Sequence, residues 1–172
     1  MRRDYSRLIL TTVAFVYSLY YGFTYTSWHF IDYVDLIFHE AGHSIFSFLG
    51  EFVQVAAGSG FQITLPLFIS IYFFYLGQKV SGSLCLMWVG INLFNVSVYA
   101  EDATAMQLNL LGGDSVIHDW NYLLSNTGLL KYTEVIASDI YILGWLMILV
   151  GTILGFYYSW NKEIRIRERV QI

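Results

Sequence analysis

Charged residues are scarce in this chain of 172 residues. Asp, Glu, Lys and Arg make up 13% of it, whereas hydrophobic residues make up 56% and aromatic residues 19%. An average soluble domain carries about 25% charged residues, and a domain of this size leaves much of its surface in water. Because a soluble fold could not bury so much apolar surface, the composition predicts a protein that is surrounded by lipid.

Cysteine and proline are scarcer still, with one residue of each. The single Cys85 excludes an intramolecular disulfide framework and any metal site made of several thiolates. In its apolar surroundings it is best interpreted as a small packed side chain. The single Pro66 fits a helical membrane protein with few kinks.

Positive charge is nearly absent from the middle of the chain. Three arginines precede the first apolar segment, four basic residues follow the last one, and only Lys79 and Lys131 lie between them. This distribution is typical of membrane topology, whereas nucleic-acid binding would need basic residues on a folded surface. We therefore expect a multi-pass integral membrane protein, with the lipid bilayer as partner, no nucleic acid, and both termini in the cytoplasm.

Five apolar segments predict an all-α, polytopic transmembrane bundle of about five or six helices in a single domain, residues 1–172. In chain order the segments are residues 8–23, 31–49, 63–76, 80–100 and 135–160. Two cytoplasmic termini require an even number of crossings, whereas five spans give an odd number. Either the second helix does not cross fully, or a sixth element lies within residues 101–134.

The connecting segments have their own patterns. Residues 51–62 alternate valine with glutamine and contain two glycines, which predicts a short hairpin or re-entrant segment. Gly50 is a plausible end for the second helix. In the polar stretch after the fourth span we expect a tight turn at residues 112–114 and a short interfacial helix at residues 120–124.

The second predicted helix contains the pattern His39-Glu40-Ala41-Gly42-His43. A spacing of four puts both imidazoles on one helical face, where two nitrogens can bind one zinc ion at about 2.0–2.1 Å. Glu40 lies beside the metal and can act as general base, taking a proton from zinc-bound water and passing it to a leaving amine. Ionisable side chains in mid-membrane cost about 2.5–3.5 kcal/mol each if unpaired, which disfavours a chance match to so short a motif.

Phe-His-Glu-Ala-Gly-His at residues 38–43, followed by Gly50 and a further apolar segment, resembles the site-2 protease family of intramembrane zinc proteases. That family carries the His-Glu-x-x-His motif on one transmembrane helix and takes an aspartate from a later helix as third ligand. Residues 91–95 and 101–103 stand where the family has Asn-Leu-Leu-Pro and Leu-Asp-Gly. The family's proline is absent here, Ala103 replaces the glycine, and the spacing differs. The resemblance, to a small and divergent bacterial-type member, covers residues 35–103. It implies cleavage of membrane-embedded peptide bonds in a bacterial inner membrane.

A polar stripe follows the fourth predicted helix. Asn92, Asn95, Tyr99 and Asp102 are three or four residues apart, so they share one helical face that should point inward. The two asparagines could bind the backbone of an extended substrate, as the resemblance implies, or form hydrogen bonds between helices.

A zinc site that keeps one position open for water needs a third protein ligand. Asp102 is favoured by the order of motifs in the family and by its place on the polar stripe. His118 is the rival, because imidazole is a common zinc ligand and the chain has only four histidines. Asp119 could ligate directly or accept the N–H of a ligand histidine. Alternatively, Asp102 could end a helix at the interface, and His118 and Asp119 could lie on an exposed loop.

Asp35 and Asp32 lie one and two turns before His39 on the same face. Either carboxylate could orient His39 through its second ring nitrogen. For Asp32 we favour a role at the start of the helix, where a carboxylate interacts with the helix dipole. For Asp35 both interpretations stay open.

The sequence thus predicts a membrane-embedded zinc metalloendopeptidase. His39 and His43 bind Zn²⁺ with Asp102 or His118, Glu40 is the general base, and the substrate is a membrane-embedded or membrane-proximal protein or peptide. The alternatives are a zinc hydrolase that acts on a lipid or a small amide, and a non-catalytic metal-binding membrane protein. The sequence does not indicate the oligomeric state.

Overall fold

The computed structural model describes residues 5–109 and 117–160. Over these residues the chain has six α-helices and no strand, which confirms the predicted all-α class. The turn predicted at residues 112–114 lies outside the described residues, as do most of the basic residues at the two ends of the chain.

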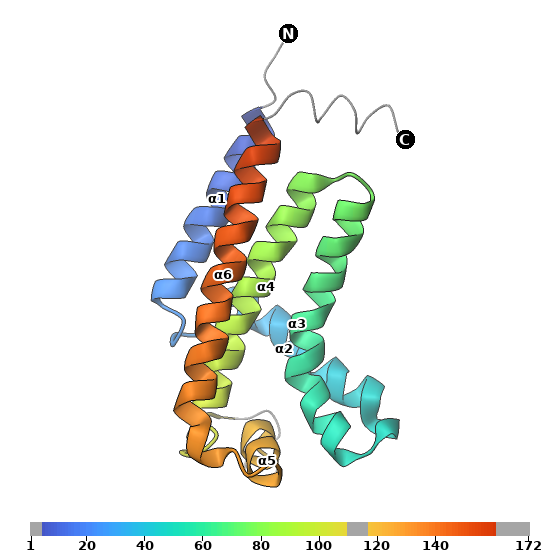
Figure 1. Ribbon diagram of the computed structural model, residues 1–172, viewed down its shortest axis with the longest axis vertical. Helices are drawn as coiled ribbons and strands as arrows, with labels where there is room; N and C mark the ends of the chain where they lie inside the picture. The colour runs from blue at the N-terminus through green and yellow to red at the C-terminus, as the bar shows by residue number, and fades with distance from the viewer. Residues whose placement is uncertain (1–4, 110–116, 161–172) are drawn as a thin grey trace. The chain divides into compact units, whose positions relative to one another are not determined.

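The helices follow one another along the chain as labelled in Figure 1: α1 (Tyr5–Phe23), α2 (Phe30–Phe46), α3 (Glu51–Tyr75), α4 (Lys79–Glu101), α5 (Asp119–Asn126) and α6 (Thr133–Trp160). Short 3-10 turns at Ser47–Leu49 and Leu130–Tyr132 precede α3 and α6. Gly50 has φ +92°. This left-handed backbone, which glycine adopts without a steric penalty, ends the α2 region where the sequence predicted.

The prediction of a hairpin or re-entrant segment at residues 51–62 is wrong. Glu51 instead begins α3, which continues to Tyr75 and contains Pro66. The two glycines suggested a turn, yet both lie inside this helix, and Gly58 provides space for side chains of α2. Gln54, Gly58 and Gln62 are four residues apart and therefore share one face of α3.

The helices pack in two compact units. One combines Met1–Thr24, Thr64–Ile91 and Gly144–Ile172, and the other combines Tyr25–Ile63 and Asn92–Leu143. Helices α3, α4 and α6 therefore contribute one part to each unit, α1 belongs to the first unit, and α2 and α5 belong to the second.

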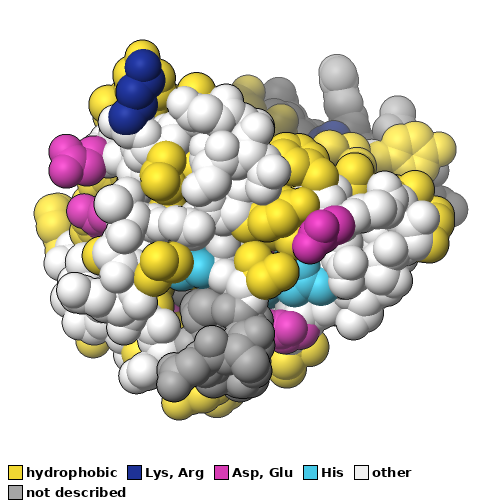
Figure 2. Space-filling view, turned by 90° about the horizontal axis from the view of Figure 1, so that it is seen from below, with side chains coloured by type: hydrophobic (Ala, Val, Ile, Leu, Met, Phe, Trp, Pro, Cys, Tyr) yellow, Lys and Arg dark blue, Asp and Glu magenta, His cyan; other side chains and the backbone are white. Residues whose placement is uncertain are grey.

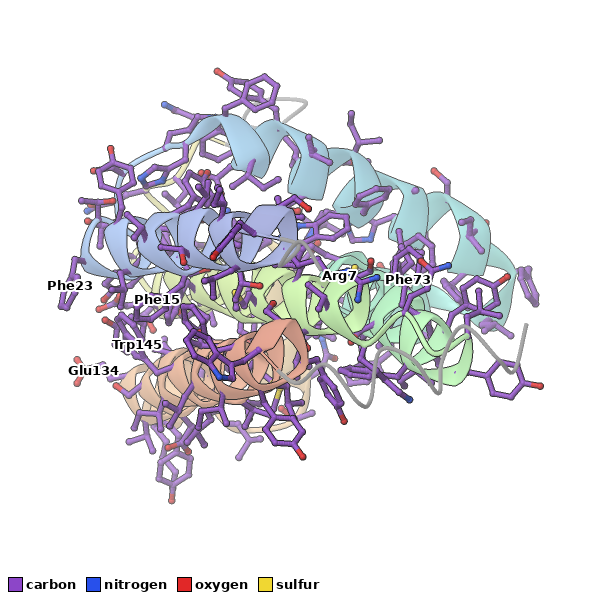
Figure 3. All side chains as sticks on the ribbon, turned by 90° about the horizontal axis from the view of Figure 1, so that it is seen from above. Arg7, Phe15, Phe23, Phe73, Glu134 and Trp145 are labelled. Carbon is purple, nitrogen blue, oxygen red and sulfur yellow. The ribbon has the colours of Figure 1, made fainter. Side chains whose placement is uncertain are left out.

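In the first unit, α1 packs against the C-terminal part of α6. The hydroxyl oxygens of Thr11 and Ser159 are 3.1 Å apart, and the ring centroids of Phe23 and Trp145 are 5.5 Å apart (Figure 3). The same part of α6 approaches α4 at Gly151, where a Cβ would lie 2.9 Å from a backbone oxygen of α4. Small residues at such contacts are typical of helices that pack in membranes.

Three helical segments are long and apolar enough to cross a membrane: Glu51–Tyr75, Lys79–Glu101 and Leu130–Trp160. The segments predicted as first and second spans are helical, as α1 and α2, but are not among these three. Large apolar side chains cover exposed faces of α1 and α6; Ile9 and Val13 of α1, for example, are 61% and 60% exposed. Apolar surface of this extent is consistent with a membrane protein, and the number of crossings stays a prediction.

Candidate metal centre

Three donor atoms converge in the second unit. His39 and His43 lie one turn apart on α2, and their Nε2 atoms are 3.0 Å from each other. Asp119, the first residue of α5, brings its Oδ2 to 2.9 Å from His39 Nε2 and 3.1 Å from His43 Nε2. His39 and Asp119 are buried and His43 is half-buried, so residues 80 positions apart in the sequence meet in a shielded group.

This donor set fits a zinc ion. Two imidazole nitrogens and one carboxylate oxygen are ordinary zinc ligands, and three of them leave a fourth tetrahedral position open. Ligand atoms at about 2.0–2.2 Å from a tetrahedral zinc lie about 3.3–3.5 Å from one another, and the observed separations of 2.9–3.1 Å are a few tenths of an ångström shorter. His39, His43 and Asp119 could therefore hold a metal ion.

The Nδ1 atoms of both histidine rings have hydrogen-bond partners that orient the Nε2 atoms toward the three-donor group. His43 Nδ1 lies 2.9 Å from the backbone oxygen of Gln54. A carbonyl oxygen only accepts, so in the neutral ring Nδ1 carries the proton and Nε2 is left to bind a metal ion. His39 Nδ1 lies 3.2 Å from Oε1 of Gln62, which imposes the same arrangement.

Gly58 of α3 faces the two Nε2 atoms. A Cβ added to Gly58 would lie 2.5 Å from His43 Nε2 and 2.7 Å from His39 Nε2. A side chain at this position would therefore enter the space that an ion held by the histidines would take. On α2, between the two histidines, a Cβ on Gly42 would clash with the backbone oxygen of Ala57, so α2 and α3 approach closely beside the histidines.

The charge of Asp119 suits the role of a ligand. Burial raises the pKa of its carboxyl, but its interactions with the rings of His39 and His43 lower that pKa and outweigh burial. The pKa of Asp119 therefore lies below its usual value, and the side chain is a carboxylate at neutral pH.

Asp102 and His118, the two residues predicted as third ligand, contact each other. His118 Nε2 lies 3.2 Å from Asp102 Oδ2, and neither residue belongs to the group of three donor atoms. Asp102 also accepts the backbone N–H groups of Gln107 and Leu108. His118 caps α5, because its Nδ1 accepts the backbone N–H of Asn121 at 3.2 Å. The proton of a neutral His118 therefore sits on Nε2 and is donated to Asp102.

Hydrogen bonds of Asp119 and Trp120 to neighbouring helices hold Asp119 beside His39 and His43. The backbone N–H of Asp119 donates to the hydroxyl of Tyr99 on α4 at 3.0 Å. The indole N–H of Trp120 donates to the hydroxyl of Ser59 on α3 at 3.1 Å. Since the two bonds reach different helices, α4 and α3 both hold the start of α5, where Asp119 lies.

A cavity of about 410 Å³ opens beside the donor atoms, and Glu40 lines it together with His39, His43 and Asp119. Part of its wall comes from the segment before α2, including Trp28. Its volume lies in the range of about 300–1,000 Å³ that is common for ligand sites. Figure 2 shows histidine side chains exposed between hydrophobic surface patches, with acidic side chains beside them.

Sequence reasoning missed Gln62 and Gly58, because residues 51–62 were interpreted as a hairpin. The spacing of four from Gln54 through Gly58 to Gln62 was the signal that could have placed them on one helical face. The role of Asp32 at the start of α2 is confirmed, since its carboxylate accepts the backbone N–H of His29. Asp35 is fully buried, but the partner of His39 Nδ1 is Gln62.

Comparisons with known proteins found no matching family model, no matching characterised protein and no matching solved structure. The resemblance to the site-2 protease family therefore stays a prediction that rests on the motif residues.

Proposed function

We propose that this protein is a membrane-embedded zinc peptidase. The observation that carries the proposal is the convergence of His39, His43 and Asp119, with donor atoms 2.9–3.1 Å apart, beside a cavity that Glu40 also lines. Asp119 takes the place of the third ligand in this proposal, ahead of Asp102 and His118. The motif on α2 and an acidic ligand from a later helix agree with the order of ligands in the family that the sequence resembles.

Each residue has a distinct role in the proposed reaction. His39, His43 and Asp119 hold the metal, and Gly58 leaves room for it. When bound, zinc supplies a Lewis acid that polarises a carbonyl and makes a water molecule more acidic. Glu40 accepts a proton in the cavity and delivers it to the nitrogen of the departing amine.

The proposed substrate is a peptide segment in or near the bilayer. Three helical segments are long and apolar enough to span a membrane, and the cavity combines apolar side chains such as Leu36 and Val98 with the polar groups of the donor site. An apolar wall suits the side chains of a membrane segment, and a few polar groups suit its amide.

The test compares Glu40→Gln with the wild-type protein in liposomes that contain fluorophore-labelled transmembrane peptides. We expect the wild type to cleave these peptides and Glu40→Gln to lose most of the activity, because general acid–base catalysis contributes about 10²–10⁴-fold. The matched control is Glu134→Gln, which removes an exposed carboxylate of α6 and should leave the rate unchanged. Equal rates for Glu40→Gln and wild type would refute the proposed mechanism. A wild type that cleaves lipids or small amides but none of the peptides would support the alternative hydrolase.

A further inference from the structure

Three hydrogen bonds link the ring of His39 to a buried carboxylate on its own helix. His39 Nδ1 lies 3.2 Å from Gln62 Oε1, Gln62 Nε2 donates to Asn95 Oδ1 at 2.8 Å, and Asn95 Nδ2 donates to Asp32 Oδ1 at 3.1 Å. The path leaves α2 at His39, crosses α3 and α4, and returns to α2 two turns earlier. All four residues belong to the second unit.

The carboxylate sets the direction of the whole path. Asp32 Oδ1 accepts from the NH₂ group of Asn95, so the oxygen of Asn95 is turned to Gln62. Gln62 must then donate its NH₂ group to Asn95, which leaves its oxygen facing His39. That oxygen can pair only with a protonated Nδ1, so in the neutral ring the Nε2 of His39 keeps its lone pair for an ion held together with Asp119 and His43.

The path is shielded from water along most of its length. Asp32 is 1%, Gln62 2% and His39 7% exposed. Hydrogen bonds in such surroundings are electrostatically stronger than in water, and neighbouring bonds polarise one another. An amide that turned the wrong way would leave a buried acceptor facing another acceptor, which is costly in a low dielectric. The arrangement is therefore held in one orientation.

We propose that Gln62, Asn95 and Asp32 are positioning residues that fix the tautomer of His39 for metal binding. The inference rests on the metal-binding part of the proposed function and is independent of the substrate. His43 obtains the same proton arrangement from the backbone oxygen of Gln54, which no side-chain substitution removes. His39 depends on side chains, so its affinity for metal can be changed by substitution at a distance.

The experiment measures zinc affinity of the full chain in detergent, by competition with a chromophoric chelator. Gln62→Leu removes the acceptor of His39 Nδ1 and keeps a side chain of similar size. Loss of such a partner of a ligand histidine typically lowers metal affinity about 10–100-fold, and we expect a loss in that range. Asn95→Leu keeps Gln62 but removes what orients it, so we expect a smaller loss. The matched control is Ser97→Ala on α4, which removes a buried hydroxyl that bonds to Phe94 O, outside the path.

A rescue variant distinguishes a positioning role of Gln62 from a packing role. Gln62→Glu restores an acceptor for His39 Nδ1 although it adds a buried charge. If Gln62 positions His39, Gln62→Glu binds zinc more tightly than Gln62→Leu. If Gln62 only packs between α3 and α4, the added charge makes Gln62→Glu no better than Gln62→Leu. Thermal unfolding of each variant in the same detergent distinguishes a loss of affinity from a loss of fold.

The outcomes are distinct for the two proposals. A wild type that binds no zinc overturns the proposed function and this inference with it. A wild type that binds zinc, with Gln62→Leu bound as tightly as wild type or Ser97→Ala, overturns the inference alone. Weakened binding in Gln62→Leu with recovery in Gln62→Glu supports it, whatever substrate the protein cleaves.

Discussion

His118 Nε2 lies 3.2 Å from Asp102 Oδ2, so the two residues that the sequence favoured as third zinc ligand form a hydrogen bond with each other. This contact also has a structural role. It joins the end of α4 to the N-cap of α5, and the next residue of α5 is Asp119. Asp102 and His118 thus hold the helix start that delivers a carboxylate to His39 and His43.

This arrangement predicts which substitutions abolish metal binding. Asp119→Asn removes the charged ligand atom, and we expect zinc affinity to fall by more than the roughly 100-fold that marks the upper end for partners of ligands. His118→Asn keeps a side chain that caps helices well but loses the bond to Asp102, so we expect a much smaller loss. Competition with a chelator measures both.

Asp102→Asn is the control for this comparison, because it changes the partner of His118 without touching the donor group. If Asp102→Asn or His118→Asn lost zinc as completely as Asp119→Asn, the third ligand would have to be reassigned. The same measurement therefore decides among all three residues that the sequence left open.

The sequence predicted most of the helices because long apolar segments can form few structures other than helices. Residues 80–100 and 135–160 closely match α4 and α6, and Gly50 ends the α2 region as expected. Residues 51–62 were misinterpreted because glycine and short Val-Gln alternation are typical of turns and strands. In α3 the small residue Gly58 instead lets side chains of α2 approach closely. Such a contact between helices cannot be read from a local sequence pattern.

The candidate site, like the fold, could be predicted only in part from the sequence. His39, Glu40 and His43 are four residues apart or less, so helical periodicity alone places them together. Asp119 is 80 residues from His39, and its position depends on how α5 is anchored. Asn95 and Asp32 were visible as polar residues on apolar helices, but their link through Gln62 required the contact between α3 and α4.

Gly58 should be indispensable for metal binding. A Cβ at Gly58 would lie 2.5 Å from His43 Nε2 and 2.7 Å from His39 Nε2, so Gly58→Ala should abolish zinc binding in the chelator competition. Gly60→Ala is the matched control, because no described atom outside its own stretch of α3 lies within 4 Å of its added Cβ. It should bind zinc normally and stabilise α3 by about 0.5–1 kcal/mol, as alanine does relative to glycine inside a helix. Full zinc binding by Gly58→Ala would show that the ion does not sit between these rings.

The bond between Trp120 and Ser59 should stabilise the docking of α5 on α3. The indole N–H lies 3.1 Å from a serine hydroxyl that is only 5% exposed. Trp120→Phe and Ser59→Ala should each lower the free energy of unfolding, and a double-mutant cycle should give a coupling of about 0.5–1.5 kcal/mol. Unfolding in mixed detergent micelles measures it.

Trp160→Phe provides the control for the loss of an indole, because Trp160 is 71% exposed. It should change the free energy of unfolding little, and it should show no coupling to Ser59→Ala. A cycle between Trp120 and Ser59 that gave strictly additive effects would contradict the proposed docking contact.

Metal removal should destabilise the folded protein through the second unit. A ligand that binds only the native state adds about 2.7 kcal/mol to the free energy of unfolding when its free concentration is 100 times its dissociation constant. Buffered zinc at that level should therefore raise the unfolding temperature, and a chelator should reverse the rise. Gly58→Ala, whose Cβ would enter the space beside the histidine nitrogens, should show no response to either reagent. A zinc-dependent rise of equal size in Gly58→Ala would mean that the stabilising ion binds elsewhere on the chain, and His39, His43 and Asp119 would lose their role as its ligands.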